Sequence, residues 1–157
     1  MTTTDYEAMR SQLVALIDKE TDALANASNF VALTFHSIAD INWLGIYVRR
    51  GDELVLGPFQ GMPACVRIPF GTGVCGTAAA TLETQRVADV HAFPGHIACD
   101  ARSRSELVVP MIVDGNLVGV LDIDSPLVGR FDAADQAGIE ALCVAFCERL
   151  TDSAGFI

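Results

Sequence analysis

The segment from Asp89 to Glu106, DVHAFPGHIACDARSRSE, gathers most of the reactive side-chain types of the chain. Imidazole, thiol and carboxyl groups surround a Pro-Gly turn, at His91, His96, Cys99, Asp100 and Glu106. The apolar residues follow neither a helical nor an alternating period, which predicts a loop held on a rigid scaffold. Because ordered loops of this length are usually functional, we expect this segment to carry the chemistry of the protein.

Three cysteines lie next to Gly or Pro, in the peptides GMPAC, GTGVCG and HIACD, at Cys65, Cys75 and Cys99. Cys75 precedes a predicted helix start, whose partial positive charge would lower the pKa of the thiol. Arg102 and Arg104 follow Cys99 and would act in the same way. Either residue is therefore a candidate thiolate at neutral pH, and the three cysteines fit a redox role as well as they fit buried thiols.

Two carboxylates, Asp122 and Asp124, interrupt an apolar strand with the sequence GVLDIDS. Alternate residues of a strand project from one face, so both carboxylates share a face while Leu121 and Ile123 point to the other. Beside a pocket, the pair would attract an ammonium group or hold a proton at a raised pKa, and Glu106 could join them. On an outer face, they would simply be solvated.

The sequence GTGVCG at 71–76 matches the dinucleotide fingerprint G-x-G-x-x-G, and it lies between a predicted strand and a helical stretch. The helical stretch is short, however, and Asp89 comes too early to bind a ribose. A nicotinamide or flavin cofactor is therefore disfavoured. The same glycines would free backbone N–H groups to bind an anionic oxygen at a helix N-terminus, on a carboxylate or a sulfoxide.

A zinc site is a second alternative. The usual ligands are present at His91, His96 and Cys99, together with Cys65 or Cys75. The spacing H-x4-H-x2-C lacks the C-x-x-C pair of structural zinc sites, and hydrogen bonding within the loop explains the histidines equally well. We therefore expect no metal.

Composition limits the class of protein. With 157 residues, 51% hydrophobic and 19% charged, the chain can form one globular domain, residues 1–157, with a sizeable core. A formal net charge of -10 argues against nucleic acid and anionic membranes as partners, because both require a cationic face. The N-terminus has no apolar signal-peptide core, and no run reaches the roughly 18 apolar residues of a membrane span. We therefore expect a cytoplasmic protein, in which cysteines are more often catalytic than permanently cross-linked.

Helices are predicted at both ends of the chain. Thr4 and Glu7 form a candidate capping box for a first helix. Ser28 is a candidate cap for a second helix, which ends near Asp40, and Asp132 for a closing helix.

The closing helix carries the two remaining cysteines. Cys143 and Cys147 lie four residues apart among Leu142, Val144 and Phe146. Free cysteine behaves as a small hydrophobic residue in such surroundings, so we expect both thiols to pack in the core.

Alternating and β-branched runs between these helices predict strands at 43–49, 53–59, 65–70, 86–89, 107–113 and 116–123, with a helical stretch at 77–82. A turn at 50–52 joins the first two strands, and Asp114-Gly115 is a strong hairpin signal. Hairpins flanked by terminal helices indicate an α+β fold with a mainly antiparallel sheet.

Four blocks of sequence are long enough to identify a family: GPFQGMPAC at 57–65, GTGVCG at 71–76, VADVHAFPGHIACDARSRSE at 87–106 and GVLDIDSP at 119–126. They resemble the free methionine-(R)-sulfoxide reductases, enzymes on a GAF-domain fold, over about residues 42–131. The resemblance implies a single GAF-like domain of the α+β class, with a central antiparallel sheet and helices packed on both sides. It also implies a closed pocket in which free methionine-R-sulfoxide is reduced to methionine.

The resemblance assigns a role to each matched residue. Cys99 matches the catalytic cysteine of the family, Cys65 its resolving cysteine and Cys75 a third cysteine of the disulfide relay. Trp43 matches an aromatic wall near the substrate methyl group. The substrate-binding and acid-catalytic carboxylates are matched by Glu106, Asp122 and Asp124.

Residues and resemblance together predict a thiol mechanism without metal or organic cofactor. Cys99 attacks the sulfoxide sulfur while a protonated carboxyl delivers a proton to the departing oxygen, and methionine leaves. The resulting sulfenic acid condenses with Cys65 or Cys75 to a disulfide, which thioredoxin then reduces. Such an activity would repair damage from oxidative stress.

The main alternative is a non-catalytic GAF-type module that binds a small ligand or senses oxidants through its cysteines. Such modules usually accompany an output domain, for which we expect no room in this chain. A zinc-dependent hydrolase is a more distant alternative. The sequence leaves open which carboxyl donates the proton and whether two copies form a homodimer.

Overall fold

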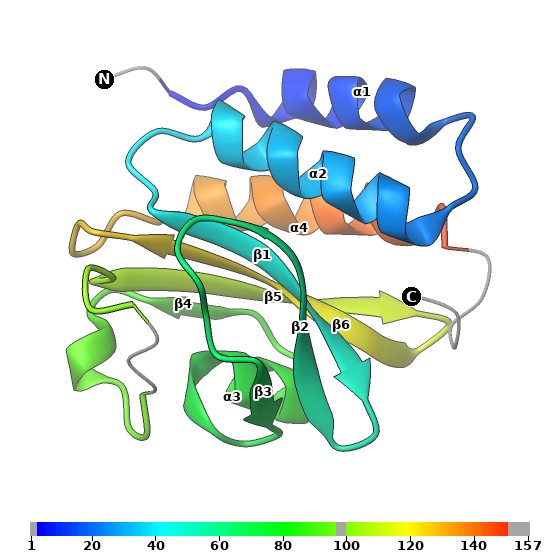
Figure 1. Cartoon of the computed structure of the whole chain (residues 1–157). Coiled ribbons are helices and arrows are strands. Elements are labelled where there is room, and N and C mark those ends of the chain that lie inside the picture. The colour runs from blue at the N-terminus through cyan, green and yellow to red at the C-terminus, as the bar shows by residue number, and fades with distance from the viewer. Residues whose placement is uncertain (1–2, 97–99, 151–157) are drawn as a thin grey trace.

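The computed structural model describes residues 3–96 and 100–150, which form a layered α+β fold (Figure 1). The elements are α1 (Tyr6–Ile17), α2 (Ala23–Ser37), β1 (Trp43–Arg50), β2 (Glu53–Gln60), β3 (Arg67–Pro69), α3 (Gly73–Thr81), β4 (Gln85–Val87), η1 (Val90–Ala92), β5 (Ser105–Val113), β6 (Asn116–Ser125) and α4 (Ala133–Cys147). The strands make one antiparallel sheet in the order β3-β2-β1-β6-β5-β4. Helices α1, α2 and α4 cover one face and α3 lies against the other, as the predicted fold class requires (Figure 1).

Aspartates begin the two N-terminal helices. The carboxylates of Asp5 and Asp22 each accept a hydrogen bond from the backbone N–H three residues further on, at 2.9 Å. These bonds satisfy N–H groups that have no acceptor within the helix. The predicted capping box of Thr4 and Glu7 and the predicted cap at Ser28 were therefore wrong. Ser28 lies inside α2, where its hydroxyl donates to a backbone carbonyl one turn earlier.

The closing helix, α4, begins as predicted. The Asp132 carboxylate accepts from the N–H of Asp135, and the Asp135 carboxylate accepts from the N–H of Asp132 in return, at 2.8 and 3.0 Å. This reciprocal pair is a capping box. Cys143 and Cys147 are 2% and 8% exposed and pack in the core between α4 and the sheet, which confirms their structural role.

Both predicted hairpins are present, and β5 and β6 form the longer of the two. Their turn is Asp114-Gly115, where both residues have positive φ, 51° and 78°. Two-residue hairpin turns of this type require positive φ at both positions, which explains why Asp and Gly occupy them.

The ladder between β5 and β6 is interrupted once. Moving away from the turn, Ile112 of β5 faces Leu117 of β6. The residue before it in β5, Met111, faces Gly119, so Val118 is skipped. Strand β6 therefore contains one extra residue at this point, a β-bulge that shifts the pairing of all residues beyond it.

Side-chain alternation divides the apolar residues into two cores, one on each face of the sheet. Leu121 and Ile123 of β6 belong to the core beneath α1, α2 and α4. Val120 belongs to the smaller core on the α3 face. Asp122 and Asp124 share a face, as predicted, and they line a cavity on the α3 side, so the pocket and not the solvated outer face is the environment found.

Helix α3 is longer than the predicted stretch at 77–82, because it begins at Gly73 inside the glycine-rich sequence. The strand predicted at 65–70 is reduced to the three residues of β3. The chain therefore passes from the edge of the sheet into a helix that covers the α3 face (Figure 1).

The predicted loop from Asp89 contains a 3-10 turn, η1, in which the Asp89 carboxylate accepts a hydrogen bond from the backbone N–H of His91. Val90 is fully buried, and Phe93 packs against the core of the α3 face. The end of the predicted loop belongs to β5, so that Glu106 projects from a strand.

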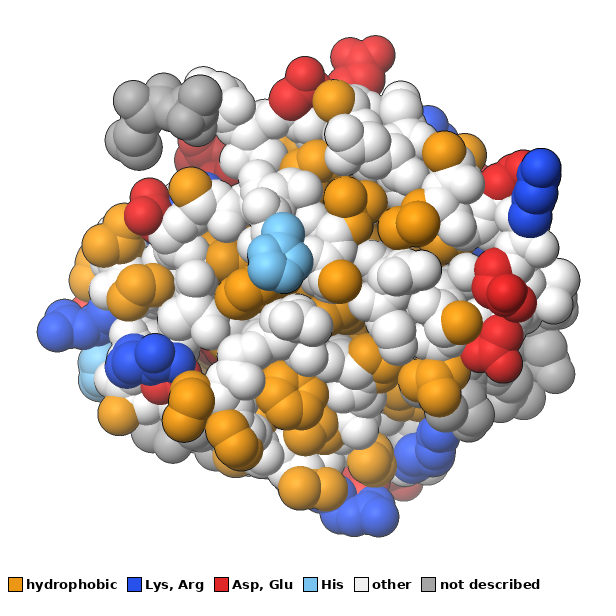
Figure 2. All heavy atoms as spheres, turned by 45° about the horizontal axis from the view of Figure 1, so that its top comes forward, with side chains coloured by type: hydrophobic (Ala, Val, Ile, Leu, Met, Phe, Trp, Pro, Cys, Tyr) orange, Lys and Arg blue, Asp and Glu red, His pale blue; other side chains and the backbone are white. Residues whose placement is uncertain are grey.

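The outer face of the helical layer is shown in Figure 2, with apolar side chains dispersed among polar ones and most charged groups near the margin. Val14, Leu16 and Leu24 of α1 and α2 are among the exposed apolar residues. In the part of the chain that the structure describes, no helix has both the length and the apolar character needed to cross a membrane.

Helix α1 is joined to α4 through Tyr6. The Tyr6 hydroxyl donates a hydrogen bond to the Asp135 carboxylate at 2.7 Å. The Tyr6 ring lies directly over Gly138, where a Cβ atom would overlap the ring. Glycine therefore permits the close approach of the two helices.

We predict that Gly138→Ala destabilises the protein, although alanine normally stabilises a helix by about 1 kcal/mol relative to glycine. Overpacking against Tyr6 should lower the free energy of unfolding by about 1–3 kcal/mol, measured by urea denaturation. In a Tyr6→Ala background the ring is absent, and Gly138→Ala should then be stabilising. The same loss in both backgrounds would show that the Tyr6 contact is not the cause.

Candidate active site

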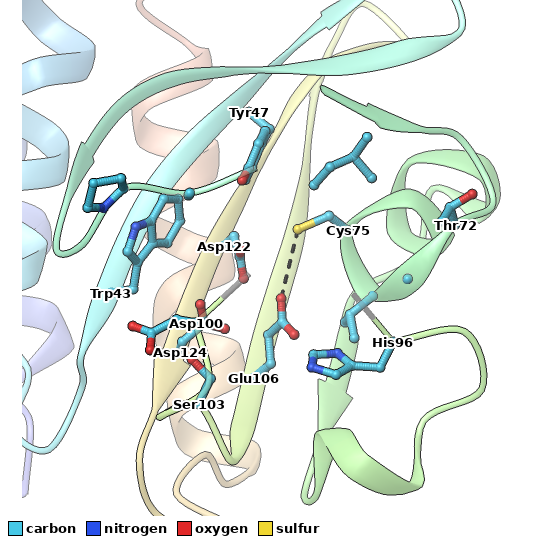
Figure 3. Close-up of a pocket in the computed structure, with 15 residues that line it drawn as sticks. Trp43, Tyr47, Thr72, Cys75, His96, Asp100, Ser103, Glu106, Asp122 and Asp124 are labelled. Atoms are coloured by element: carbon cyan, nitrogen blue, oxygen red, sulfur yellow. Dashed lines mark hydrogen bonds between the residues drawn. The ribbon is translucent and has the colours of Figure 1, made fainter. Parts of the chain in front are cut away.

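A cavity lies on the α3 face of the sheet, between the strands and α3 with its adjoining loops (Figure 3). It is lined by five of the predicted site residues, Trp43, Cys75, Glu106, Asp122 and Asp124. Cys65 follows two further lining residues, Pro63 and Ala64. The seventh predicted residue, Cys99, lies within 97–99, outside the described residues. Five of the seven predicted residues therefore line one pocket, although they come from segments that are distant along the chain.

Strand register brings three of these residues into one row. Trp43 on β1 faces Asp124 on β6, and Asp124 faces Glu106 on β5. Residues directly opposite on antiparallel strands lie on the same side of the sheet, with Cβ atoms about 4.5–5.5 Å apart. Asp122 lies two residues away on the same side. Like charges in such positions destabilise a sheet, so the arrangement points to a ligand.

The three carboxyl groups are shielded from solvent. Glu106 and Asp122 are each 6% exposed, and Asp124 is half-buried. Burial raises the pKa of all three, and the neighbouring Asp122 charge raises the pKa of Glu106 and Asp124 further. The cluster therefore retains a proton at pH values where a solvated carboxyl is ionised. Within the described residues, Asp122 Oδ1 is buried without a hydrogen-bond partner.

Cys75 differs from the prediction of a thiolate. It lies in the first turn of α3 but is 4% exposed, and burial raises the pKa of its thiol well above the ordinary value. The charges of Asp122 and Glu106 raise the pKa further. Cys75 Sγ lies 3.9 Å from Glu106 Oε1 (Figure 3). Desolvation and nearby carboxylates thus outweigh the helix dipole, and the thiol stays protonated at neutral pH.

The start of α3 forms part of the cavity wall. Thr72, Gly73 and Val74 line the cavity, and the Thr72 side chain makes no capping hydrogen bond. First-turn N–H groups have no acceptor within a helix and carry the positive end of its dipole. They are the candidate donors for the anion-binding position that the glycine-rich sequence predicted, which stays a prediction. In Figure 3, this helix start and the carboxylates on the sheet lie on different sides of the cavity.

The aromatic wall is made by Trp43, which is 2% exposed. Its ring stacks on Tyr47 and Phe59 with centroid distances of 5.9 and 5.4 Å. Gly45 lies beneath the indole, where a Cβ atom would overlap the ring. Tyr47 also lines the cavity, and its hydroxyl donates to the Cys65 carbonyl at 2.9 Å. Tyr47 was not among the predicted site residues, although strand alternation places it on the same face as Trp43.

Asn42, next to β1, holds the loop at 100–104 through hydrogen bonds. Its amide donates to Asp100 at 3.1 Å and to Ser103 at 3.2 Å, and both acceptors line the cavity. Arg102 donates to the Asp100 carboxylate at 3.0 Å and thereby lowers the pKa of that carboxyl. The Arg102 charge is therefore paired with Asp100. Sequence reasoning gave no role to Asn42 or Ser103, which carry no motif signal.

The cysteines of the described residues are in different states. Cys65 is disulfide-bonded, whereas Cys75, Cys143 and Cys147 are free thiols. The role predicted for Cys99 as the nucleophile stays a prediction, because Cys99 lies outside the described residues.

The dinucleotide interpretation is excluded by topology. The fingerprint requires parallel strands on both sides of its helix. Here β3, before α3, pairs antiparallel with β2, and β4, after α3, lies at the other edge of the sheet. The glycines therefore serve the helix start alone.

Among the residues considered as zinc ligands, the rings of His91 and His96 lie 6.4 Å apart in different surroundings, and Cys99 lies outside the described residues. His91 interacts through Nδ1 with Asp89 at 3.2 Å on the surface, whereas His96 lines the cavity. Burial and the His91 charge lower the pKa of His96. A different set of groups comes together inside the cavity: ligand atoms of Cys75, Glu106 and Asp122 lie within 4.8 Å of one another.

Sequence comparison agrees with this geometry. The GAF domain family matches residues 12–149. The free methionine-R-sulfoxide reductase of Escherichia coli (strain K12) is 52% identical over 137 residues, which cover 87% of this chain and 83% of that protein. The enzyme of the same name from Saccharomyces cerevisiae is 52% identical over 124 residues, 76% of this chain and 69% of that protein.

Solved structures give the same result. The free methionine-R-sulfoxide reductase of Neisseria meningitidis in complex with its substrate has a TM-score of 0.92 and 40% identity, and the match covers 100% of this chain and 97% of that one. The fRMsr of Staphylococcus aureus in complex with substrate also has a TM-score of 0.92, with 48% identity and 96% and 99% coverage. A putative GAF sensor protein from Burkholderia vietnamiensis has a TM-score of 0.91 and 57% identity, with 95% coverage of both chains. The chain therefore belongs to the free methionine-R-sulfoxide reductase family of GAF-domain proteins.

Proposed function

We propose that this protein reduces free methionine-R-sulfoxide to methionine by thiol chemistry. The observation that carries the proposal is the buried carboxylate cluster of Glu106, Asp122 and Asp124, which shares a cavity with the open start of α3 and the Trp43 wall. A free amino acid has the matching charges, and the relatives above act on or bind this substrate by their names.

Each end of the substrate has a partner of opposite charge. Its ammonium group binds the carboxylates, one of which, Asp122, has an oxygen without a partner in the described residues. Its carboxylate binds N–H groups in the first turn of α3. The methylsulfinyl side chain then packs against Trp43.

Reduction begins with attack of the Cys99 thiolate on the sulfoxide sulfur. A carboxyl of the cluster delivers a proton to the oxygen, which passes to Cys99 as a sulfenic acid while methionine leaves. The raised pKa of Glu106 and of Asp124 supports this step, because a donor must hold its proton at the working pH.

Cys65 resolves the sulfenic acid by forming a disulfide with Cys99 and releasing water, and a dithiol protein such as thioredoxin restores both thiols. Two observations favour Cys65 over Cys75 for this step. Cys65 is disulfide-bonded in the structure, and the buried Cys75 thiol is free and protonated. Cys75 then serves in a later exchange, and the reaction belongs to the reducing cytoplasm, where it repairs oxidative damage to free methionine.

The direct test incubates the protein with dithiothreitol and each epimer of methionine sulfoxide and measures methionine. Release from the R epimer alone is expected. The similarity to the Burkholderia GAF sensor protein favours a second candidate function, that of a non-catalytic sensor. Binding of the substrate without release of methionine would establish that candidate instead.

We predict a division of labour among the cysteines. Cys99→Ser should release no methionine, whereas Cys65→Ser should release about one equivalent in a single turnover without reductant and then fail to cycle with thioredoxin. The matched control is Cys143→Ala, which should keep full turnover and lose roughly 1 kcal/mol of stability to a buried cavity. Full activity in Cys99→Ser would refute the assignment of the nucleophile.

We predict strong discrimination against capped substrates. An N-acetyl group removes the ammonium and leaves buried carboxylates without a partner, at a cost of about 3–5 kcal/mol. The ratio of kcat/KM between free and N-acetyl methionine-R-sulfoxide should therefore be on the order of a few hundredfold. Asp122→Asn should reduce this ratio, and Asp52→Asn, at an exposed position, should not. Equal kcat/KM values for both substrates would show that the carboxylates do not recognise the ammonium group.

We predict that the substrate-free protein loses stability as the pH rises. Because the pKa of Glu106 is raised in the folded state, the folded protein binds more protons than the unfolded chain above about pH 4.5, the ordinary value for Glu. The free energy of unfolding should therefore fall from that pH through the pKa of the folded state. Glu106→Gln, which cannot ionise, should flatten this fall and exceed the wild type at neutral pH, whereas the exposed Glu83→Gln should not. Unchanged pH dependence in Glu106→Gln would contradict the role of its burial.

A further inference from the structure

We propose that the cavity also binds a thiophilic divalent cation of the Zn²⁺ type, held by Cys75 Sγ and by carboxylate oxygens of Glu106 and Asp122. These groups come from α3, β5 and β6, so the fold itself assembles the site. The proposed reaction uses no metal. The cation would therefore be a ligand of the cavity in addition to the substrate.

The geometry is close to that of a bound cation. The three ligand atoms lie within 4.8 Å of one another, and Cys75 Sγ is 3.9 Å from Glu106 Oε1. Sulfur and oxygen ligands at tetrahedral zinc, with bonds of about 2.3 and 2.0 Å, are roughly 3.5 Å apart. Small side-chain rotations therefore suffice to close the site.

A second observation also calls for a ligand. Asp122 is 6% exposed, and its Oδ1 is buried without a hydrogen-bond partner among the described residues. Buried polar atoms in folded proteins are nearly always satisfied, and an orphaned carboxylate oxygen is especially costly. A cation between Asp122 and Cys75 would satisfy it.

The donor set selects the class of cation. One thiolate and two carboxylates suit Zn²⁺, Co²⁺ and related borderline metals, whereas Mg²⁺ and Ca²⁺ prefer oxygen alone. The proton of the Cys75 thiol and the proton held by the carboxyl groups of Glu106 and Asp122 are both released to solvent on binding, and no electron is transferred. Water or Asp124, which lines the same cavity, can complete four-coordination.

The cation and the substrate compete. Both use the Glu106 and Asp122 carboxylates, so that occupation by one leaves no partner for the other. Competition rests on the proposed function, but cation binding does not.

The test uses Co²⁺ and the disulfide form of the full-length protein, in which Cys65 is blocked and Cys75 and Cys143 are free. Addition of Co²⁺ should produce a thiolate-to-cobalt charge-transfer band that saturates at about one cation per chain. Cys75→Ser should abolish the band, Asp122→Asn should weaken binding at least about tenfold, and Cys143→Ala should leave it unchanged. Circular dichroism of each variant checks that it is folded.

The absence of a band, its persistence in Cys75→Ser or its loss in Cys143→Ala would overturn the proposal. Free methionine-R-sulfoxide, which the disulfide form cannot reduce, should then displace the cation, and the N-acetyl form should not. A band that depends on Cys75 and Asp122 but survives excess substrate would uphold the cation site. It would count against the substrate assignment instead, so the two proposals fail separately.

Discussion

Three carboxyl groups share one buried cavity, and this concentration of potential negative charge is the constraint to which the rest of the structure responds. Moving a carboxylate from water into a protein interior is costly unless a counter-charge or a proton accompanies it. The substrate-free protein meets this cost partly by protonation, as the raised pKa of Glu106 and of Asp124 indicates. Asp122 Oδ1 is buried without a hydrogen-bond partner among the described residues.

The surroundings of the cluster are built to keep it rigid and dry. Strand pairing fixes Trp43, Asp124 and Glu106 in one row, and the larger core beneath the sheet holds these strands from the other side. Stacking of Trp43 on Tyr47 and Phe59 closes the cavity laterally. Positive potential comes from backbone dipoles at the start of α3. This arrangement of opposite charges favours binding of a small zwitterion over binding of a neutral ligand.

The sequence was informative where chemistry follows local spacing. The Asp-x-Asp pattern predicted a carboxylate pair on one strand face, and Asp114-Gly115 predicted the hairpin that carries it. Local patterns were less informative where several short polar residues compete for one role, as at the helix starts, where Asp22 caps α2 and Ser28 does not. Each of these residues is a good cap in isolation, and only the path of the chain chooses between them.

Properties that depend on distant residues could not be predicted. The helix start beside Cys75 was visible in the sequence, but the carboxylates that reverse its pKa shift come from β5 and β6. The loop contacts of Asn42 with Asp100 and Ser103 likewise join segments that no motif connects. Electrostatics and loop packing of this kind are set by tertiary structure, whereas hairpins and strand faces are set by sequence neighbours.

The β-bulge between the hairpin turn and the site has a consequence for how this enzyme can change. If the two strands paired without this bulge and kept all their residues, the register that begins at the turn would continue unshifted, and Glu106 would stand opposite Ile123 instead of Asp124. Glu106 would then be paired with a residue of the hydrophobic core, and the row of Trp43, Asp124 and Glu106 that lines the cavity would be broken. A one-residue insertion or deletion in this hairpin must therefore change either the bulge or the residue pairs that line the cavity, so the length of the hairpin constrains the cavity as its side chains do.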